Sequence, residues 1–216
     1  MKAAAAALLG AFVLFAAPPG HAALPAGPDL PEADRARLIA GEVLVDGVRS
    51  DEAGGAARAR AAMRGPAEAA WAVVVSCEAA FRYLPGLRAC EVLEDTGEHA
   101  RVRQVVRPAW FLPTTEFVYR VERQPWRAMR FHLEAGEVDA LEGAWRFEPL
   151  DEGLILVTHE IRVDPRLLAP RWLVRAAIRG DLPDMLACIR ALAGASLNEV
   201  MAARDGARCA PPAPQR

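Results

Sequence analysis

Hydrophobic and polar residues alternate along the middle of the chain, between residues 88 and 163. In one stretch Phe117, Tyr119 and Val121 fall on one side, and charged residues fall on the other. Because successive side chains of a β-strand point to opposite faces, this period of two predicts strands with one apolar and one solvated face. The expected strands of this antiparallel meander are 88–95, 98–107, 114–123, 127–135, 138–150 and 154–163.

Helical periodicity marks the regions on both sides of the meander. Helix formers follow a proline that suits a first helical position, and they predict two short helices between residues 66 and 84. Apolar residues recur at helical spacing after residue 170, which predicts a long amphipathic helix to about Ala203. Pro183 interrupts that helix, so we expect a kink or a break near Gly180.

Together these elements predict an α+β fold. The alternating segment 41–49 is typical of a first strand, and residues 57–63 fit a further strand. The expected architecture is a curved antiparallel sheet of about six or seven strands wrapped around a long C-terminal helix, with two short helices after the first strand. The sheet needs a cover for its apolar face, and the last helix is the only predicted element long enough to provide it.

The N-terminus has the layout of a secretory signal peptide. Lys2 precedes an apolar run, and small residues follow up to Ala22, after which we predict cleavage. We therefore expect export to the periplasm or the extracellular space. An uncleaved membrane anchor is the alternative, although the run is shorter than the ~20 residues that a span needs. The predicted divisions are a signal peptide at 1–22, a loose lead-in at 23–40, one domain at 41–203 and a flexible tail at 204–216.

The composition argues against two kinds of function. With 26 Lys and Arg against 28 Asp and Glu, the formal net charge is −2, which gives no reason to expect nucleic acid binding. Metal sites use closely spaced Cys and His ligands, whereas His99, His132 and His159 are scattered over the predicted strands. We therefore predict neither a metal site nor a cofactor.

A stripe of arginines follows the last predicted helix, at Arg171, Arg175 and Arg179. Such a stripe can contact anionic lipid head groups, which would bring the protein to a membrane surface as a peripheral partner. The more common interpretation is the solvated back of an amphipathic helix. The sequence leaves both interpretations open.

Several motifs resemble those of the START-like superfamily, which includes polyketide cyclases, coenzyme Q-binding proteins and the major birch pollen allergen. The motifs are the segment 65–94, which reads GPAEAAWAVVVSCEAAFRYLPGLRACEVLE, the Gly143-Ala144-Trp145 strand, a strand that ends in Asp164-Pro165, and the final helix RWLVRAAIRGDLPDMLACIRALA. The resemblance covers roughly residues 57 to 195. It implies a helix-grip fold with a pocket between the sheet and the final helix, but it implies no common catalytic set.

The cysteines depart from the motifs of these relatives. Cys77 and Cys90 both stand where many relatives carry other residues, and the two substitutions arrive together. In an oxidising compartment this favours a disulfide between them, with free buried cysteines or a reactive thiol as alternatives. A second bridge, Cys188–Cys209, can form only if the final helix ends well before residue 203, near Gly194.

The strand faces indicate which residues line the pocket. His159 and Gln104 fall on apolar faces, and an apolar pocket with a few polar groups suits a small hydrophobic ligand with one polar end. A core histidine that is satisfied by a neighbour is the alternative for His159. The predicted cavity residues are Gln104, Phe117, Tyr119, Met129, Phe131, Trp145, His159, Met185 and Ile189.

Three functions fit this pattern. The first is binding or carrying a small hydrophobic ligand, such as a lipid, an isoprenoid quinone or a polyketide-like molecule. The second is a polyketide cyclase or aromatase-like enzyme, for which His159 and Tyr119 are the plausible acid and base groups. The third is a protein-interaction module without a ligand. The few ionisable residues on the apolar faces favour binding over catalysis, so no catalytic residue is predicted.

Overall fold

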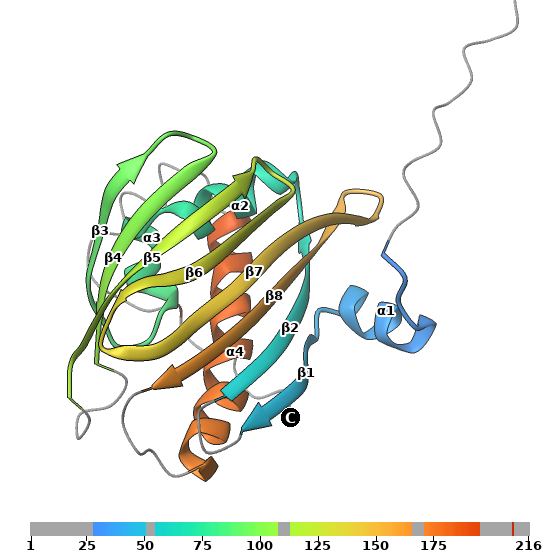
Figure 1. Cartoon of the computed structure of the whole chain (residues 1–216). Helices are drawn as coiled ribbons and strands as arrows, with labels where there is room; N and C mark the ends of the chain where they lie inside the picture. The colour runs from blue at the N-terminus through green and yellow to red at the C-terminus, as the bar shows by residue number, and fades with distance from the viewer. Residues whose placement is uncertain (1–27, 51–54, 108–112, 166–170, 195–208, 210–216) are drawn as a thin grey trace, which may run out of the picture.

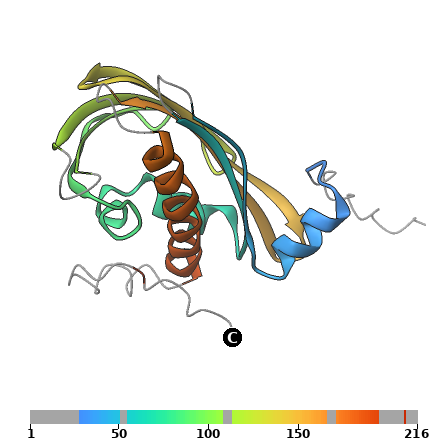
Figure 2. The same ribbon diagram turned by 90° about the horizontal axis from the view of Figure 1, so that it is seen from below.

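A computed structural model describes residues 28–50, 55–107, 113–165 and 171–194, together with Cys209. Eight strands in these ranges form one antiparallel sheet. The expected α+β helix-grip architecture is confirmed, with a curved, open sheet and a C-terminal helix in its concavity (Figures 1 and 2). The helices are α1 (Glu32–Ile39), α2 (Ala67–Val75), α3 (Cys77–Tyr83) and α4 (Arg171–Gly194). The strands are β1 (Val43–Ser50), β2 (Gly55–Arg64), β3 (Leu87–Asp95), β4 (His99–Val106), β5 (Thr115–Gln124), β6 (Ala128–Gly136), β7 (Val138–Asp151) and β8 (Leu154–Pro165).

The strand order is β1-β2-β8-β7-β6-β5-β4-β3. The meander β3 to β8 folds back so that β8 pairs with β2, and α2 and α3 carry the chain from β2 to β3 at the far edge. The sheet has one strand more than the upper expected number, because the alanine-rich segment of β2 is a full strand that pairs on both sides. The two short helices consequently follow the second strand rather than the first.

Helix α4 is continuous from Arg171 to Gly194, so of the kink or break expected near Gly180 the break is wrong. Pro183 lies inside the helix without ending it. Leu182 and Met185 flank this proline and are buried in the core, and such tertiary packing outweighs the lost backbone hydrogen bond. The expected continuation of the helix to residue 203 lies outside the described residues.

Helix α1 was not expected, since residues 23–40 carry the pattern of a loose lead-in. Leu38 is fully buried and packs with Leu44, Ala62 and Leu156. Because Ala62 and Leu156 alternate with residues that face α4, α1 covers the opposite face of the sheet (Figure 2). One strongly buried side chain in eight residues makes too weak a periodic signal to predict such a helix.

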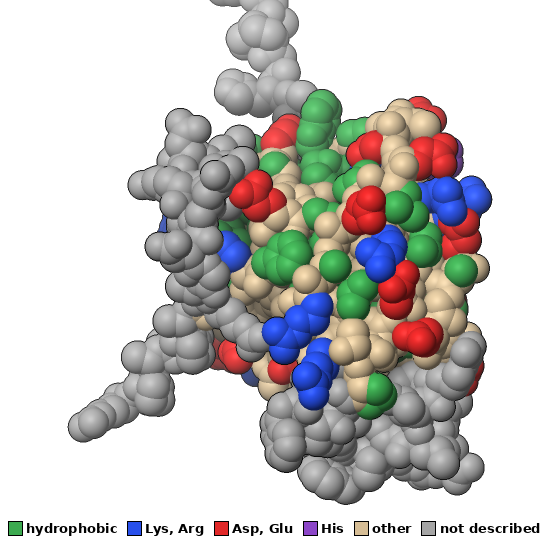
Figure 3. All heavy atoms as spheres, turned by 90° about the vertical axis from the view of Figure 1, so that its left-hand side faces the viewer, with side chains coloured by type: hydrophobic (Ala, Val, Ile, Leu, Met, Phe, Trp, Pro, Cys, Tyr) green, Lys and Arg blue, Asp and Glu red, His purple; other side chains and the backbone are tan. Residues whose placement is uncertain are grey.

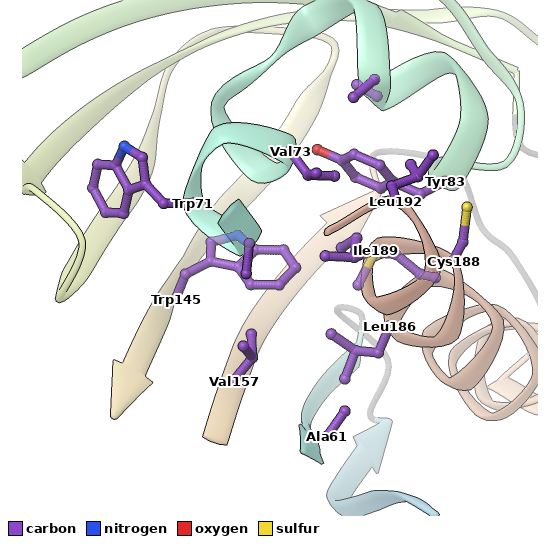
Figure 4. Packing of buried hydrophobic residues seen from close by; sticks show 14 of the residues in the cluster. Ala61, Trp71, Val73, Tyr83, Trp145, Val157, Leu186, Cys188, Ile189 and Leu192 are labelled. Atoms are coloured by element: carbon purple, nitrogen blue, oxygen red, sulfur yellow. The ribbon is translucent and has the colours of Figure 1, made fainter. Parts of the chain in front are cut away.

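The main core lies where α4 packs against β1 and β2. Ala59 and Ala61 of β2 are fully buried, and their small side chains let the helix approach the sheet closely. Leu186 and Ile189 of α4 point toward Trp145 and Val157 of the sheet, as Figure 4 shows. We call this the solid half, because side chains of α4 and the sheet pack directly on each other there. A second hollow of about 380 Å³ lies at its edge, lined by residues of α1 and β1 and by Pro183. Within the described residues, no helix combines the length and the apolar character that a bilayer crossing requires.

Candidate functional site

A cavity of about 440 Å³ lies between the other half of the sheet and the helices. Residues of β3 to β8 form its wall, and α4 and the α2–α3 junction cover it. Its volume far exceeds that of a few waters, each of which takes about 30 Å³ in the liquid. The predicted cavity residues that line it are Gln104, Phe117, Tyr119, Met129, Phe131, Trp145, His159 and Met185. Ile189 does not line it, because it is fully buried in the adjacent core against the sheet.

The strand register brings these side chains together. Met129 pairs with Trp145, and Trp145 pairs with His159, so the three lie in one row across β6, β7 and β8. Gln104 pairs with Phe117 across β4 and β5 and extends the same face. Directly paired residues of an antiparallel sheet share a face, which is why alternation along each strand could place them.

Gly143 makes room for the aromatic wall of the cavity. A Cβ atom at this position would collide with the ring of Phe131 and with the carbonyl oxygen of Glu160. The first residue of the Gly143-Ala144-Trp145 motif is therefore required for packing. Phe131 in turn contacts Tyr119, with the two ring centroids 5.9 Å apart.

His159 is held as a neutral side chain within this wall. It is 3% exposed, and its ring stacks on Trp145 with the centroids 3.8 Å apart. Its Nδ1 lies 3.3 Å from the carbonyl oxygen of Ala144. Because that carbonyl can only accept, the proton sits on Nδ1. Burial lowers the pKa of His159 from 6.5 to about 4, so the imidazole carries no charge at neutral pH.

The tyrosines of the cavity also stay neutral. The hydroxyl of Tyr83 donates to the carbonyl oxygen of Val74 at 3.1 Å, and burial raises the pKa of this phenol. Burial raises the pKa of Tyr119 as well. Neither phenol can therefore ionise near neutral pH, and the site offers no phenolate for chemistry.

Two disulfides are present, Cys77–Cys90 and Cys188–Cys209, with Cα–Cα distances of 5.4 Å and 5.3 Å. The predicted first bridge is confirmed, and the possible second bridge, Cys188–Cys209, is also present. Cys77 begins α3 and Cys90 lies on β3, and both line the cavity. The first bridge therefore ties the α2–α3 cover to the edge of the sheet. In the described ranges, no group of His, Cys, Asp and Glu could hold a metal ion.

Several lining residues were not predicted. The α2–α3 junction contributes Val75, Ser76 and Ala80, which only the tertiary fold brings over the sheet. Arg123 at the end of β5 and Asp181 on α4 add the charged groups. Alternation could have found Arg123, since it lies two residues beyond Val121 on the same face, but its charge is typical of a solvated position.

The outer surface beside the cavity is mixed in character. Phe81 of α3 and Val92 and Leu93 of β3 are exposed. Figure 3 shows that hydrophobic side chains on the described part of this side lie among acidic and basic ones. Glu91 and Glu94 flank the two β3 residues in sequence, which is how many proteins protect an edge strand from further pairing. The side chains of the arginine stripe at 171, 175 and 179 lie outside the described residues.

A curved antiparallel sheet that grips a C-terminal helix beside an apolar cavity defines the START-like class of proteins. The chain belongs to the family described as polyketide cyclase / dehydrase and lipid transport, which matches residues 63–190, more than half of its length. The expected superfamily is thereby confirmed. No curated protein matches the chain by sequence.

Solved structures support the fold. The chain is similar to a STAR-related lipid transfer protein (fragment 25–204) from Xanthomonas axonopodis, with 19% identity, a TM-score of 0.58, and coverage of 70% of this chain and 93% of that one. Human STARD10 has 13% identity and a TM-score of 0.58, with 70% of this chain and 68% of that one covered. The di-domain ARO/CYC BexL of the BE-7585A biosynthetic pathway has 14% identity and a TM-score of 0.50, with 75% and 52% covered. At these identities the likeness shows the fold alone.

Proposed function

We propose that the protein binds and carries a small hydrophobic molecule in the cavity of about 440 Å³. The cavity itself carries this proposal. Pockets that bind small molecules typically measure about 300–1,000 Å³, and this cavity falls in that range. Its wall is mostly apolar, with Gln104 and a few other polar groups, which is the composition of sites for small hydrophobic ligands. The family includes lipid transport in its description, which agrees with this use of the cavity.

The energetics favour an apolar ligand. Burial of each methylene group contributes about 0.8 kcal/mol, so about ten methylenes contribute roughly 8 kcal/mol before the costs of association. A lipid tail, an isoprenoid quinone or a polyketide-like molecule would all supply such groups. A polar group in the lining would then orient the polar end of the ligand.

Catalysis by the same pocket is the less favoured function. A general base works best with a pKa near the working pH, and burial holds the pKa of His159 at about 4. Tyr119, whose pKa is raised, is a poor acid at neutral pH. Asp181 is the one carboxylate among the described lining residues, and a single carboxylate is a poor set of acid and base groups for a cyclase, so we expect binding without turnover.

The place of action that we propose is an oxidising compartment outside the cytoplasm. Both disulfides support this, because such bonds persist in exported proteins and are rare in the cytosol. The predicted signal peptide at 1–22 lies outside the described residues. Mass spectrometry of the protein recovered from the exporting cell would test cleavage, and an N-terminus that still begins at Met1 would contradict it.

Native mass spectrometry and extraction of co-purified molecules would identify the ligand directly. A Met129→Trp variant tests the location, since Met129 is 5% exposed and lines the cavity. The larger side chain should fill the void and weaken binding of an apolar fluorescent probe by about tenfold or more. The matched control is Arg130→Trp, which adds the same ring at the neighbouring exposed position. Equal probe binding by both variants would place the site elsewhere.

A further inference from the structure

Arg123 is the last residue of β5 that faces the cavity. The inward residues of this strand are Thr115, Phe117, Tyr119, Val121 and Arg123, and all of them line the void. From Thr115 to Arg123 there are eight residue steps, or about 26 Å at ~3.3 Å per step. The strand therefore supplies a long apolar track that ends at a guanidinium group. Among the described residues of the lining, Arg123 is the one that carries a positive charge, because His159 is neutral.

The guanidinium of Arg123 is buried and only partly satisfied. Its side chain is 9% exposed, and its Nη1 donates to both carboxylate oxygens of Asp95, at 2.8 and 2.9 Å. Its Nε is buried and has no hydrogen-bond partner among the described residues. Leaving a buried donor of a charged group unpaired costs free energy. A ligand in the cavity could supply the missing acceptor.

Asp95 fixes the direction in which the guanidinium points. This carboxylate lies at the end of β3, and the hydrogen bond from Arg123 holds its pKa below the usual range, aided by the backbone N–H of Gly97. Asp95 accepts hydrogen bonds from Nη1 of the guanidinium. The edge that carries Nε therefore makes no hydrogen bond to Asp95. Arginine binds carboxylates through two parallel N–H donors on one edge, so a carboxylate at this edge would meet the arrangement of donors that arginine offers to anions.

We propose that Arg123 binds the anionic head of an amphiphilic ligand, and that this head is a carboxylate. The proposal rests on the proposed function, because it concerns the polar end of the same ligand. The charge of Asp95 already balances that of Arg123, so a monoanion suits the pair better than a phosphate dianion, which Asp95 would repel more strongly. The apolar track along β5 would hold the chain of the ligand.

The test compares three probes with the same chain: hexadecanoic acid, its methyl ester and hexadecyl phosphate. Each would displace a fluorescent apolar probe from the delipidated full-length protein. We expect the acid to bind at least about tenfold more tightly than the ester, since only the acid offers a charged acceptor. Arg123→Gln should remove this preference and leave the affinity for the ester unchanged. The matched control is Arg120→Gln, on the same strand but with a side chain that is 57% exposed, which should keep the preference.

The outcomes separate this inference from the proposed function. Equal binding of acid and ester by the unmodified protein would overturn the role of Arg123 and leave hydrophobic binding intact. Binding of none of the probes, together with an empty protein in native mass spectrometry, would instead contradict the proposed function. Tighter binding of the phosphate than of the acid would overturn the choice of a carboxylate. If Arg123→Gln does not fold, Arg123→Lys decides, because it keeps the charge but loses the fork, and a preference reduced at least threefold is expected.

Discussion

The two halves of the sheet use the same antiparallel pairing but treat their concave faces differently. Over β1 and β2 the concave face carries small residues such as Ala59 and Ala61, and α4 lies directly on it. Over β5 and β6 it carries Phe117, Tyr119 and Phe131, and the cover is the α2–α3 junction, which leaves a cavity. The comparison shows that large aromatic side chains do not by themselves fill the space on the concave side of a curved sheet. The position of the covering helices decides which half is solid.

The largest effect is expected in the solid half. Ile189→Ala should lower the free energy of unfolding by about 2–5 kcal/mol, because Ile189 is fully buried and its loss leaves a new void. Met129→Ala in the hollow half should cost less, since Met129 already borders an empty space. Urea denaturation of both variants measures the difference. An equal or larger loss for Met129→Ala would mean that the two halves are packed alike.

The next effect concerns the bridge that closes the hollow half. Replacing Cys77 and Cys90 together by alanine should lower the free energy of unfolding by about 2–4 kcal/mol, as expected for a loop of this size. The loss should also be largest locally, because this bridge joins α3 to β3. Hydrogen exchange should therefore speed up first at the amides of α3. If hydrogen exchange sped up equally at the amides of α4, the two halves of the sheet would not lose stability independently.

The smallest expected effect is the dependence on pH that His159 contributes. Its pKa is about 4 in the folded protein against 6.5 for an ordinary histidine, so the unfolded chain binds the proton more readily. The free energy of unfolding therefore decreases as the pH falls from about 6.5 to about 4, by up to roughly 3 kcal/mol. Above this window His159 is neutral in both states and contributes no such dependence.

The His159→Leu variant isolates this contribution. The difference in stability between the unmodified protein and the variant should shift in favour of the variant as the pH is lowered through that window. Thermal unfolding at several pH values gives the measurement. A constant difference between pH 7 and pH 4 would show that the imidazole of His159 is not held neutral.

The sequence predicted the regular part of the fold well, because alternation reports directly on burial. All six meander strands were placed by that pattern, and their register explains why His159 and Trp145 share a face. The elements that it missed depend on tertiary contacts. Helix α1 is held by the buried Leu38 and by ion pairs of Asp34 and Arg35 with the sheet, and α4 continues through Pro183 because its neighbours are packed.

The site was predicted less completely than the fold. The wall residues follow from strand faces, but the cover at Val75 and Ser76 could not be placed without knowing where α2 and α3 cross the sheet. Ile189 was assigned to the cavity because it shares a helix face with Met185, whereas the helix meets the solid half of the sheet at that point. Arg123 was overlooked because a charged residue at a strand end usually faces solvent.

The pairing of β2 with β8 also has a kinetic consequence. Ala59 pairs with His159, so the solid half forms only when segments far apart in the chain meet. The hollow half is built from consecutive hairpins, β3 to β7, whose contacts are local. Since local contacts form faster than distant ones, we expect the meander to gain protection in pulsed hydrogen exchange before β2 does. Early protection of β2 would contradict this order. The half in which α4 packs directly on the sheet would thus be the last to assemble.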